Sequence, residues 1–512
     1  MKLKINNSSL NIFANLLSLI ISFVISFFLT PYITKHAGIE AYGLVGLAHN
    51  FTSYIAILTT AVNSMASRFI ILELHKNRIT EANKYFSSIL GANTIIAFIT
   101  ITIGIILSLN IEQIINVSNA LVHDATITFL LVFISFALSL IFSIFSVVYY
   151  YKNLLYVGAF VNIIGEFIRT TAIFVIFTLI GVKIQYSIAA MIFSSIFINS
   201  FNIFFTKKNI SELKISFKLF EFKKILEILS AGIWNSITKL SQVLLNGLDL
   251  IIVNLFINGT IMGIVSLGKQ FSSILISVIS SVSDTFLPKF LKAYAKDEKE
   301  LHKEFFKSTK ILGYFSCMIL SIFFIYCQDF FKLWVPEQDS AFLSCIAFLS
   351  LLPIIISGPI YSMFSIYTVI NKVRPQAVAT LIMSVLSTAT VFLLLKFTKL
   401  GVYAIVGTSS VYGVLKNLTY NMYCLKRYVH LSIKKCYFII LKNLVIMAIL
   451  IFANTVLKNR FEITSFPKLI LMCIISFLFC NIIYFTIATS IQDKKNVLNY
   501  CKSKFFLNKR EG

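Results

Sequence analysis

The chain has 512 residues, of which 58% are hydrophobic and 13% are charged, and its formal net charge is +24. Soluble globular proteins are about 45–50% apolar and about 25% charged, so this composition excludes an ordinary soluble domain. The positive charge does not indicate nucleic-acid binding, because the lysines and arginines lie in short gaps between long apolar runs. The composition therefore predicts a protein that is mostly surrounded by lipid.

Long apolar runs follow one another along the whole chain. A helix needs about 20 apolar residues to cross the hydrocarbon core of a membrane. The first run follows Lys2 and Lys4 and is too long for the core of a signal peptide, so we expect a retained helix. A kink is expected in the tenth run, at Pro353, Gly358 and Pro359. The predicted membrane helices, about fourteen in number, span residues 10–33, 43–67, 86–109, 125–150, 154–181, 185–206, 226–256, 261–287, 308–331, 341–370, 376–397, 400–424, 436–457 and 466–490.

The gaps between these runs differ in their content of lysine and arginine. If the N-terminus is cytoplasmic, the cytoplasmic gaps and tails hold 32 of the 45 basic residues and the outer gaps hold 8. Cytoplasmic loops of membrane proteins carry such an excess. The pattern predicts an even number of spans, with both termini in the cytoplasm. It also predicts that the basic gaps contact membrane lipid, with no nucleic acid as a partner.

The sequence contains no pattern that indicates a catalytic, cofactor or metal site. Its eight cysteines form no Cys-x-x-Cys pair, and no nucleophile motif, phosphate-cradling glycine loop or metal-ligand cluster is found. We therefore predict no catalytic residue, no cofactor and no metal, and a protein that is not an enzyme.

A shift of 220 residues aligns the second predicted helix with the eighth without gaps. Residues 42–47 then lie over 262–267, and residues 49–53 lie over 269–273. The repeat contains six helices, so both halves have the same orientation, as in secondary transporters that bind substrate near the membrane midplane. We expect an all-α polytopic membrane protein in three parts. These are two six-helix bundles, residues 1–210 and 211–430, and residues 431–512 with two additional helices and a basic cytoplasmic tail.

The first two predicted helices carry a group of recognisable residues: Phe13-Ala14-Asn15, Pro31-Tyr32-Ile33, Gly38, Tyr42-Gly43 and, at the cytoplasmic end of the second helix, Arg68. This pattern resembles the polysaccharide-export branch of the multidrug/oligosaccharidyl-lipid/polysaccharide exporter superfamily. Within it, the chain is most similar to the flippases for repeat units of O-antigen, the outer part of lipopolysaccharide, and of capsule.

The resemblance implies two bundles that work by alternating access in the bacterial inner membrane. The implied cargo is an undecaprenyl-diphosphate-linked oligosaccharide, moved from the cytoplasmic to the periplasmic leaflet. The implied partners are the polymerase and chain-length proteins of the same pathway. Arg68 matches a family position and is also explained as an anchor at the membrane surface.

Charged side chains at bilayer depth are costly and usually face a cavity or a partner. Glu166 and Arg169 lie one turn apart in the fifth predicted helix, Lys239 and Asp249 lie in the seventh, and Lys269 lies in the eighth. Counting residues from the helix ends places Glu166, Arg169 and Lys239 in a middle layer. Asp249, Lys269 and His49, the repeat counterpart of Lys269, form a second layer nearer the outer side.

Two interpretations of these residues stay open. In the first, Arg169, Lys239 and Lys269 line a cationic cavity for a diphosphate, with His49 adding charge when protonated. The sugars would then be held by Asn15, Asn50, Asn235 and Gln270, and Glu166 and Asp249 are candidate coupling residues. In the second, the charges only stabilise the fold as ion pairs, Glu166 with Lys239 and Asp249 with Lys269.

Two other functions also stay open. A multidrug exporter of the same superfamily would need an anionic cavity for cationic drugs, and only two acidic residues, Glu166 and Asp249, lie at bilayer depth. A membrane polysaccharide polymerase or ligase would need acidic groups or a large outer loop to activate a hydroxyl. The longest outer loops, residues 109–125 and 331–341, are short.

Overall fold

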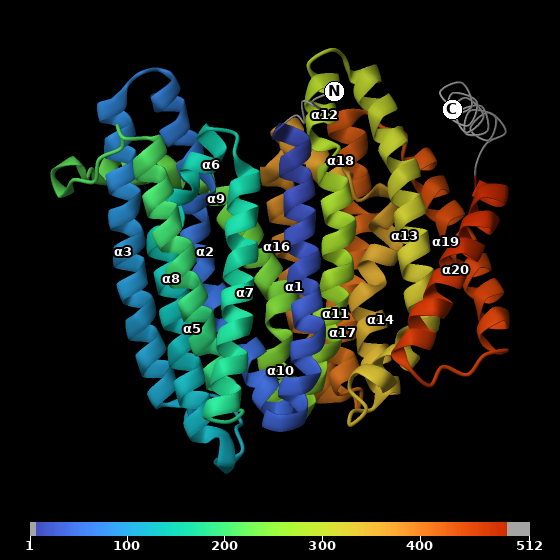
Figure 1. Ribbon diagram of the computed structural model, residues 1–512. Coiled ribbons are helices and arrows are strands. Elements are labelled where there is room, and N and C mark those ends of the chain that lie inside the picture. Colours follow the sequence, from blue (N-terminus) through green and yellow to red (C-terminus); the bar gives the residue numbers. More distant parts are fainter. Residues whose placement is uncertain (1–6, 489–512) are drawn as a thin grey trace, which may run out of the picture. The chain divides into compact units, whose positions relative to one another are not determined.

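The computed structural model describes residues 7–488, and every regular element in this range is helical (Figure 1). In the described part, 13 helices are long and apolar enough to cross a membrane. The remaining expected span, residues 400–424, is interrupted at Thr419 between α17 and α18. The prediction of an all-α polytopic membrane protein with about fourteen spans is confirmed. Lys2, Lys4 and the predicted basic tail lie outside the described residues.

The described chain forms two compact units. The first contains residues 7–274 and 371–416, and the second contains residues 275–370 and 417–488, so the boundaries fall within α11 and α17. The helices of the first unit are α1 Asn7–Ala37, α2 Ile39–His75, α3 Ile79–Leu109, α4 Ile111–Ile114, α5 Val122–Phe142, α6 Val147–Tyr151, α7 Leu155–Leu179, α8 Ile184–Asn209, α9 Phe222–Gln242, α10 Asp249–Phe256, most of α11 Gly259–Asp284, α16 Val373–Phe397 and most of α17 Val402–Leu418. Short 3-10 or π segments are η1 Asn119–Leu121, η2 Ser143–Ser146, η3 Phe217–Leu219 and η4 Val243–Gly247.

The second unit contains α12 Leu287–Tyr294, α13 Glu298–Trp334, α14 Ser340–Ser357, η5 Gly358–Ile360, α15 Met363–Val369, α18 Tyr420–Val429, α19 Ile433–Lys458 and α20 Phe466–Ala488. The predicted kink lies here. α14 ends at Ser357, a 3-10 turn containing Pro359 follows, and α15 begins at Met363. Because proline has no backbone N–H, it interrupts the helical hydrogen bonds at this point. The predicted break in residues 341–370 is confirmed.

Successive membrane-spanning segments alternate in direction along the chain. We call the side on which α1 begins and α2 ends the basic side, because the lysine-rich gaps at residues 76–78, 152–154 and 207–221 lie there. Asn77 and Asn153 help to close the first two of these turns, with φ angles of 57° and 54°. Asparagine tolerates this left-handed conformation better than most residues. The other side of the membrane is called the opposite side.

Small residues allow α2 and α9 to pack closely in the first unit. A Cβ added to Gly232 of α9 would lie 1.9 Å from the carbonyl oxygen of Ala61 on α2. One turn further along α9, Ser236 donates a hydrogen bond of 2.6 Å to the carbonyl of Ile57. Close backbone approach of this kind is typical of helix pairs in membranes, where small residues form the interface. The α2–α9 pair therefore positions the two helices that carry most of the candidate site.

Candidate functional site

The seventh predicted membrane helix is broken within the membrane. α9 ends at Gln242, the π-helix η4 covers Val243–Gly247, and α10 begins at Asp249. The predicted span over residues 226–256 is confirmed as the segment Phe222–Phe256, and the π-helix lies within it. The break escapes detection by hydropathy because Val243, Leu244 and Leu245 are apolar and no proline is present. Irregular backbone at membrane depth must find other hydrogen-bond partners, and π segments often mark functional sites.

The carbonyl oxygens of η4 accept hydrogen bonds from side chains of three other helices. The donors come from α2, α11 and α16, so the break is the meeting point of four chain segments. These bonds join Thr388 to Leu244 at 3.3 Å, Lys269 to Asn246 at 3.0 Å, and Asn50 and Tyr54 to Gly247, both at 3.0 Å.

An ion pair lies directly beside this break. Asp249, at the first position of α10, is 4% exposed and pairs with the ammonium group of Lys269 on α11. The Ser409 hydroxyl of α17 also makes a side-chain hydrogen bond to Asp249. A buried carboxylate needs such partners, because desolvation of an unpaired charge is costly. The predicted Asp249–Lys269 pairing is confirmed.

A second ion pair lies within α7. The guanidinium of Arg169 is 2.8 Å from the carboxylate of Glu166, one turn earlier on the same helix. The predicted pairing of Glu166 with Lys239 is therefore wrong, because Arg169 satisfies the carboxylate locally.

Lys239 of α9 differs from Arg169 and Lys269 in its surroundings. Its side chain is partly exposed, and no residue between 7 and 488 gives its ammonium group a hydrogen bond or an ion pair. It lies seven residues before Asn246, which corresponds to about 10 Å along a helix that rises about 1.5 Å per residue. Lys239 is thus an uncompensated positive charge about one turn before the start of the break and two turns before Asn246.

The predicted amide residues fall into two groups. Asn50 bonds to η4, and Gln270 accepts a hydrogen bond from the hydroxyl of Tyr42, so both lie between α2 and the second-repeat helices. Asn235 donates to the Ser64 hydroxyl at 3.0 Å, also between α9 and α2. Two residues stand apart: Asn15 is exposed and bonds only within α1, and Arg68 is exposed on α2.

The sequence profile described as polysaccharide biosynthesis protein matches residues 8–294, more than half of the chain. The chain belongs to the polysaccharide biosynthesis protein family. An uncharacterized membrane protein of Bacillus subtilis (strain 168), EpsK, is 24% identical over 506 residues, which cover 98% of this chain and 99% of the relative.

Two solved structures share the fold of this polysaccharide biosynthesis family member. The lipid II flippase MurJ in an inward closed conformation has a TM-score of 0.65 at 17% identity, covering 94% of this chain and 98% of that chain. An inward-facing multidrug resistance transporter of the MATE family has a TM-score of 0.63 at 14% identity, covering 78% and 92%. The resemblance to the polysaccharide-export branch of their superfamily is confirmed.

The charges of the polysaccharide biosynthesis protein do not cancel within the membrane. In the first unit, away from the ends of the membrane spans, α7, α9, α10 and α11 carry Arg169, Lys239 and Lys269 against Glu166 and Asp249. The two acids are both occupied by internal ion pairs, which leaves Lys239 as the excess charge. Such an arrangement attracts an anion more readily than a cation.

Two residues near the basic side were missed by the sequence analysis. The guanidinium of Arg374 on α16 lies 4.7 Å from the ring centroid of Trp234, the residue that precedes Asn235 on α9. This cation–π contact puts a further positive charge beside the α9 face. The only available signal was that Trp234 is one of two tryptophans in the chain.

Proposed function

We propose that this protein is a flippase for undecaprenyl-diphosphate-linked oligosaccharide repeat units. It moves them by alternating access from the cytoplasmic to the periplasmic leaflet of the bacterial inner membrane, for O-antigen, capsule or exopolysaccharide synthesis. The observation that carries the proposal is Lys239, an intramembrane cation without a described partner, in a family member whose two nearby acids are already paired.

The charge arrangement supports a diphosphate as the group that enters the site. A diphosphate carries several oxygen acceptors, and lysine binds such a group as a point charge while arginine can grip it with two parallel hydrogen bonds. Lys239 is available in the described state, and Lys269 and Arg169 become available if their carboxylate partners are protonated or bind another cation. Glu166 and Asp249 are therefore the candidate coupling residues.

The amide groups support a sugar-binding role in a different conformation. Asn50, Asn235 and Gln270 are bonded between α2 and the second-repeat helices in the described state. Movement of α2 away from α9 and α11 would release all three groups. Asn15, which is exposed, is available without such a movement.

The proposal includes the domain organisation and the orientation predicted from the sequence. Residues 1–210 and 211–430 form a parallel repeat, followed by residues 431–512. Contact between repeat counterparts supports this: a Cβ on Gly46 would lie 2.6 Å from the hydroxyl of Ser266, which is 220 residues further on. The basic side is cytoplasmic, since lysine and arginine concentrate there. The polymerase and chain-length proteins of the pathway are the proposed protein partners.

Two alternatives predict different cargo or different chemistry. A multidrug exporter for cationic drugs shares the superfamily fold but would have to bind its substrate beside an excess of positive charge. A polymerase or ligase would form or transfer a glycosidic bond at the outer surface instead of moving the lipid carrier.

The test is deletion of the gene in its native host, followed by measurement of surface polysaccharide and of the leaflet that holds the lipid-linked repeat units. For a flippase, surface polymer disappears and completed repeat units accumulate on the cytoplasmic leaflet. If repeat units reach the outer leaflet but stay unpolymerised or unattached, the protein is a polymerase or ligase. If surface polysaccharide is unchanged while sensitivity to cationic drugs rises, it is a multidrug exporter.

A further inference from the structure

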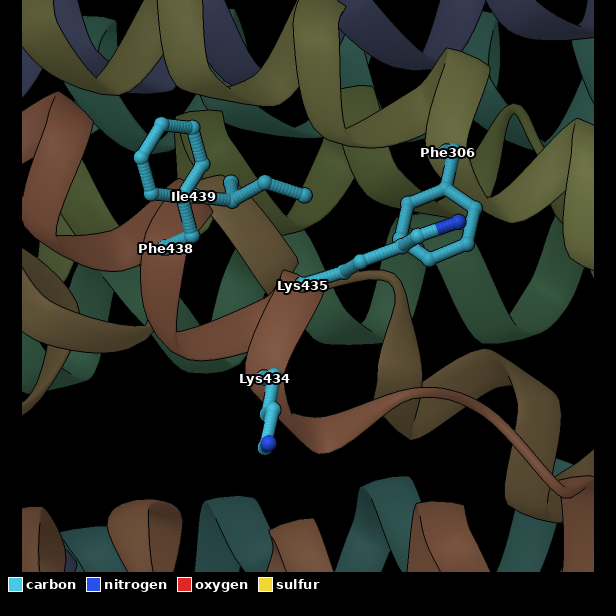
Figure 2. A pocket seen from close by; sticks show the side chains of 5 residues that line it. All are labelled: Phe306, Lys434, Lys435, Phe438 and Ile439. Atoms are coloured by element: carbon cyan, nitrogen blue, oxygen red, sulfur yellow. The ribbon is translucent and has the colours of Figure 1, made fainter.

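The second unit has an open cavity at its surface near the start of α19. Its volume is 370 Å³, and it is lined by Phe306 of α13 and by Lys434, Lys435, Phe438 and Ile439 of α19 (Figure 2). Phe306 and Ile439 pack against the buried core between α13, α15 and α19, which fixes the inner wall of the cavity. The surface of the cavity is almost entirely apolar, and its two basic lining residues are Lys434 and Lys435.

The position of α19 places this cavity at the surface of the membrane. Lys434 and Lys435 lie in the first turn of α19, a membrane-spanning helix that begins on the basic side. Phe438, one turn further along the same apolar helix, is 66% exposed. A molecule bound here would therefore have its polar end beside the lysines and its apolar end along Phe438. A membrane lipid has the same arrangement, with its headgroup at the surface and its acyl chains inside the bilayer.

The two lysines have no acidic partner. In the described part of the second unit, Lys303 and Lys307 of α13 pair with Glu300 and Glu304. No such pair involves Lys434 or Lys435, and both side chains are exposed. Figure 2 shows Lys435 reaching toward the ring of Phe306, whose centroid lies 5.8 Å from the ammonium nitrogen. Lys434 extends in another direction from the same turn.

We propose that this cavity binds an anionic phospholipid of the membrane. The lipid phosphate lies at the ammonium group of Lys435, Lys434 adds a second positive charge from the same turn, and one acyl chain follows Phe438 and Ile439. Charge complementarity favours this occupant, because basic residues at the membrane surface attract anionic lipid and basic pockets between membrane helices bind lipid headgroups. A protein segment is less suitable, since the cavity lies against the bilayer. The site is independent of the proposed transport function.

The test compares the full-length protein with K434Q/K435Q by native mass spectrometry in detergent, titrated with dioleoylphosphatidylglycerol or dioleoylphosphatidylcholine. A lysine near the membrane surface contributes about 1 kcal/mol to anionic-lipid attraction, so we expect phosphatidylglycerol affinity to fall at least tenfold in the double variant. Binding of phosphatidylcholine should change less than twofold. Inorganic phosphate at the same concentration should not displace the lipid, because it lacks the acyl chain.

The matched control is K207Q/K208Q, at the end of α8 in the first unit. These lysines are also adjacent, exposed and on the basic side, and Lys208 lies 5.9 Å from the ring centroid of Phe204. The proposal requires that this variant retains phosphatidylglycerol affinity. Equal losses in both double variants, or no loss in K434Q/K435Q, would overturn it. Melting temperatures in zwitterionic detergent identify any variant that has lost its fold, and Phe438→Ser, which keeps both lysines, must also weaken the binding.

Discussion

Gly43 of α2 and Gly263 of α11 are in direct backbone contact: a Cβ on Gly43 would lie 2.7 Å from the Cα of Gly263. The two glycines are 220 residues apart, which is the shift that aligns the two halves of the chain. Equivalent residues of a repeat meet each other only close to the axis that relates the two copies. The contact supports a two-fold axis that passes between α2 and α11 near the opposite side of the membrane.

The first prediction concerns this contact. Gly43→Val should destabilise the protein by about 1–3 kcal/mol, because the added atoms meet backbone that cannot move aside as a side chain can. A thermal melt of the purified protein in detergent should show a lower midpoint for Gly43→Val. Gly247→Ala is the stability control, since its Cβ would find its nearest neighbour at 3.4 Å, an ordinary contact distance. Equal melting temperatures of Gly43→Val and the wild type would contradict the close packing.

The second prediction concerns the buried ion pair beside the broken helix. Asp249→Asn leaves the ammonium of Lys269 without its carboxylate, and Lys269→Gln leaves the carboxylate of Asp249 uncompensated. Each single change should destabilise the protein by about 3–5 kcal/mol, because one buried charge is left unpaired. The double variant D249N/K269Q should lose much less than the sum of the two. A double-mutant cycle on melting free energies measures this coupling, and additive losses would show that the pair contributes no interaction energy.

The sequence was sufficient to predict the features that depend on composition and on single residues. Long apolar runs predicted the membrane spans, and Pro359 predicted the break after α14. The energetic cost of unpaired charge at membrane depth indicated the Asp249–Lys269 ion pair. Each of these follows from a local property with a large energetic consequence.

Features that depend on geometry between helices could not be predicted. The π-helix at Val243–Gly247 is stabilised by donors such as Asn50 and Lys269, which are distant in the sequence and individually common. Two basic residues at similar depth, Arg169 and Lys239, are candidate ion-pair partners of Glu166. Only the structure shows that Arg169 is the partner. Trp234 and Arg374 are 140 residues apart, so their contact leaves no pattern in the sequence.

The third prediction tests whether Lys239 acts on the cargo. Lys239→Gln should reduce delivery of repeat units to the surface about tenfold, because a charge-assisted hydrogen bond to a phosphate is worth about 1.5–3 kcal/mol. Its melting temperature should stay near that of the wild type, since Lys239 has no described partner to lose. Lys239→Arg keeps the charge and should retain most of the activity, and Lys208→Gln serves as a surface control. Surface polysaccharide is measured at equal protein level. A wild-type amount of surface polysaccharide in Lys239→Gln would show that Lys239 does not act on the cargo.

A reciprocal pair of asparagines closes the first unit on the opposite side. The backbone N–H of Asn116 donates to the side-chain oxygen of Asn254 at 2.8 Å, and the Asn254 amide donates to the Asn116 carbonyl at 2.9 Å. The Asn116 amide also donates to the Asn254 carbonyl at 2.8 Å. These bonds attach the loop before α5, in the first repeat, to the end of α10, in the second.

The fourth prediction follows from this attachment. If the two repeats separate on this side to release cargo, joining residues 116 and 254 covalently must stop the cycle. In N116C/N254C, oxidation should block new surface polysaccharide, and dithiothreitol should restore it. N116C and N254C alone should respond to neither treatment, which controls for the native cysteines. Disulfide formation is followed by a mobility shift on a gel. Continued polysaccharide export by fully cross-linked protein would mean that this side stays closed throughout transport, and that the exit path lies elsewhere in the molecule.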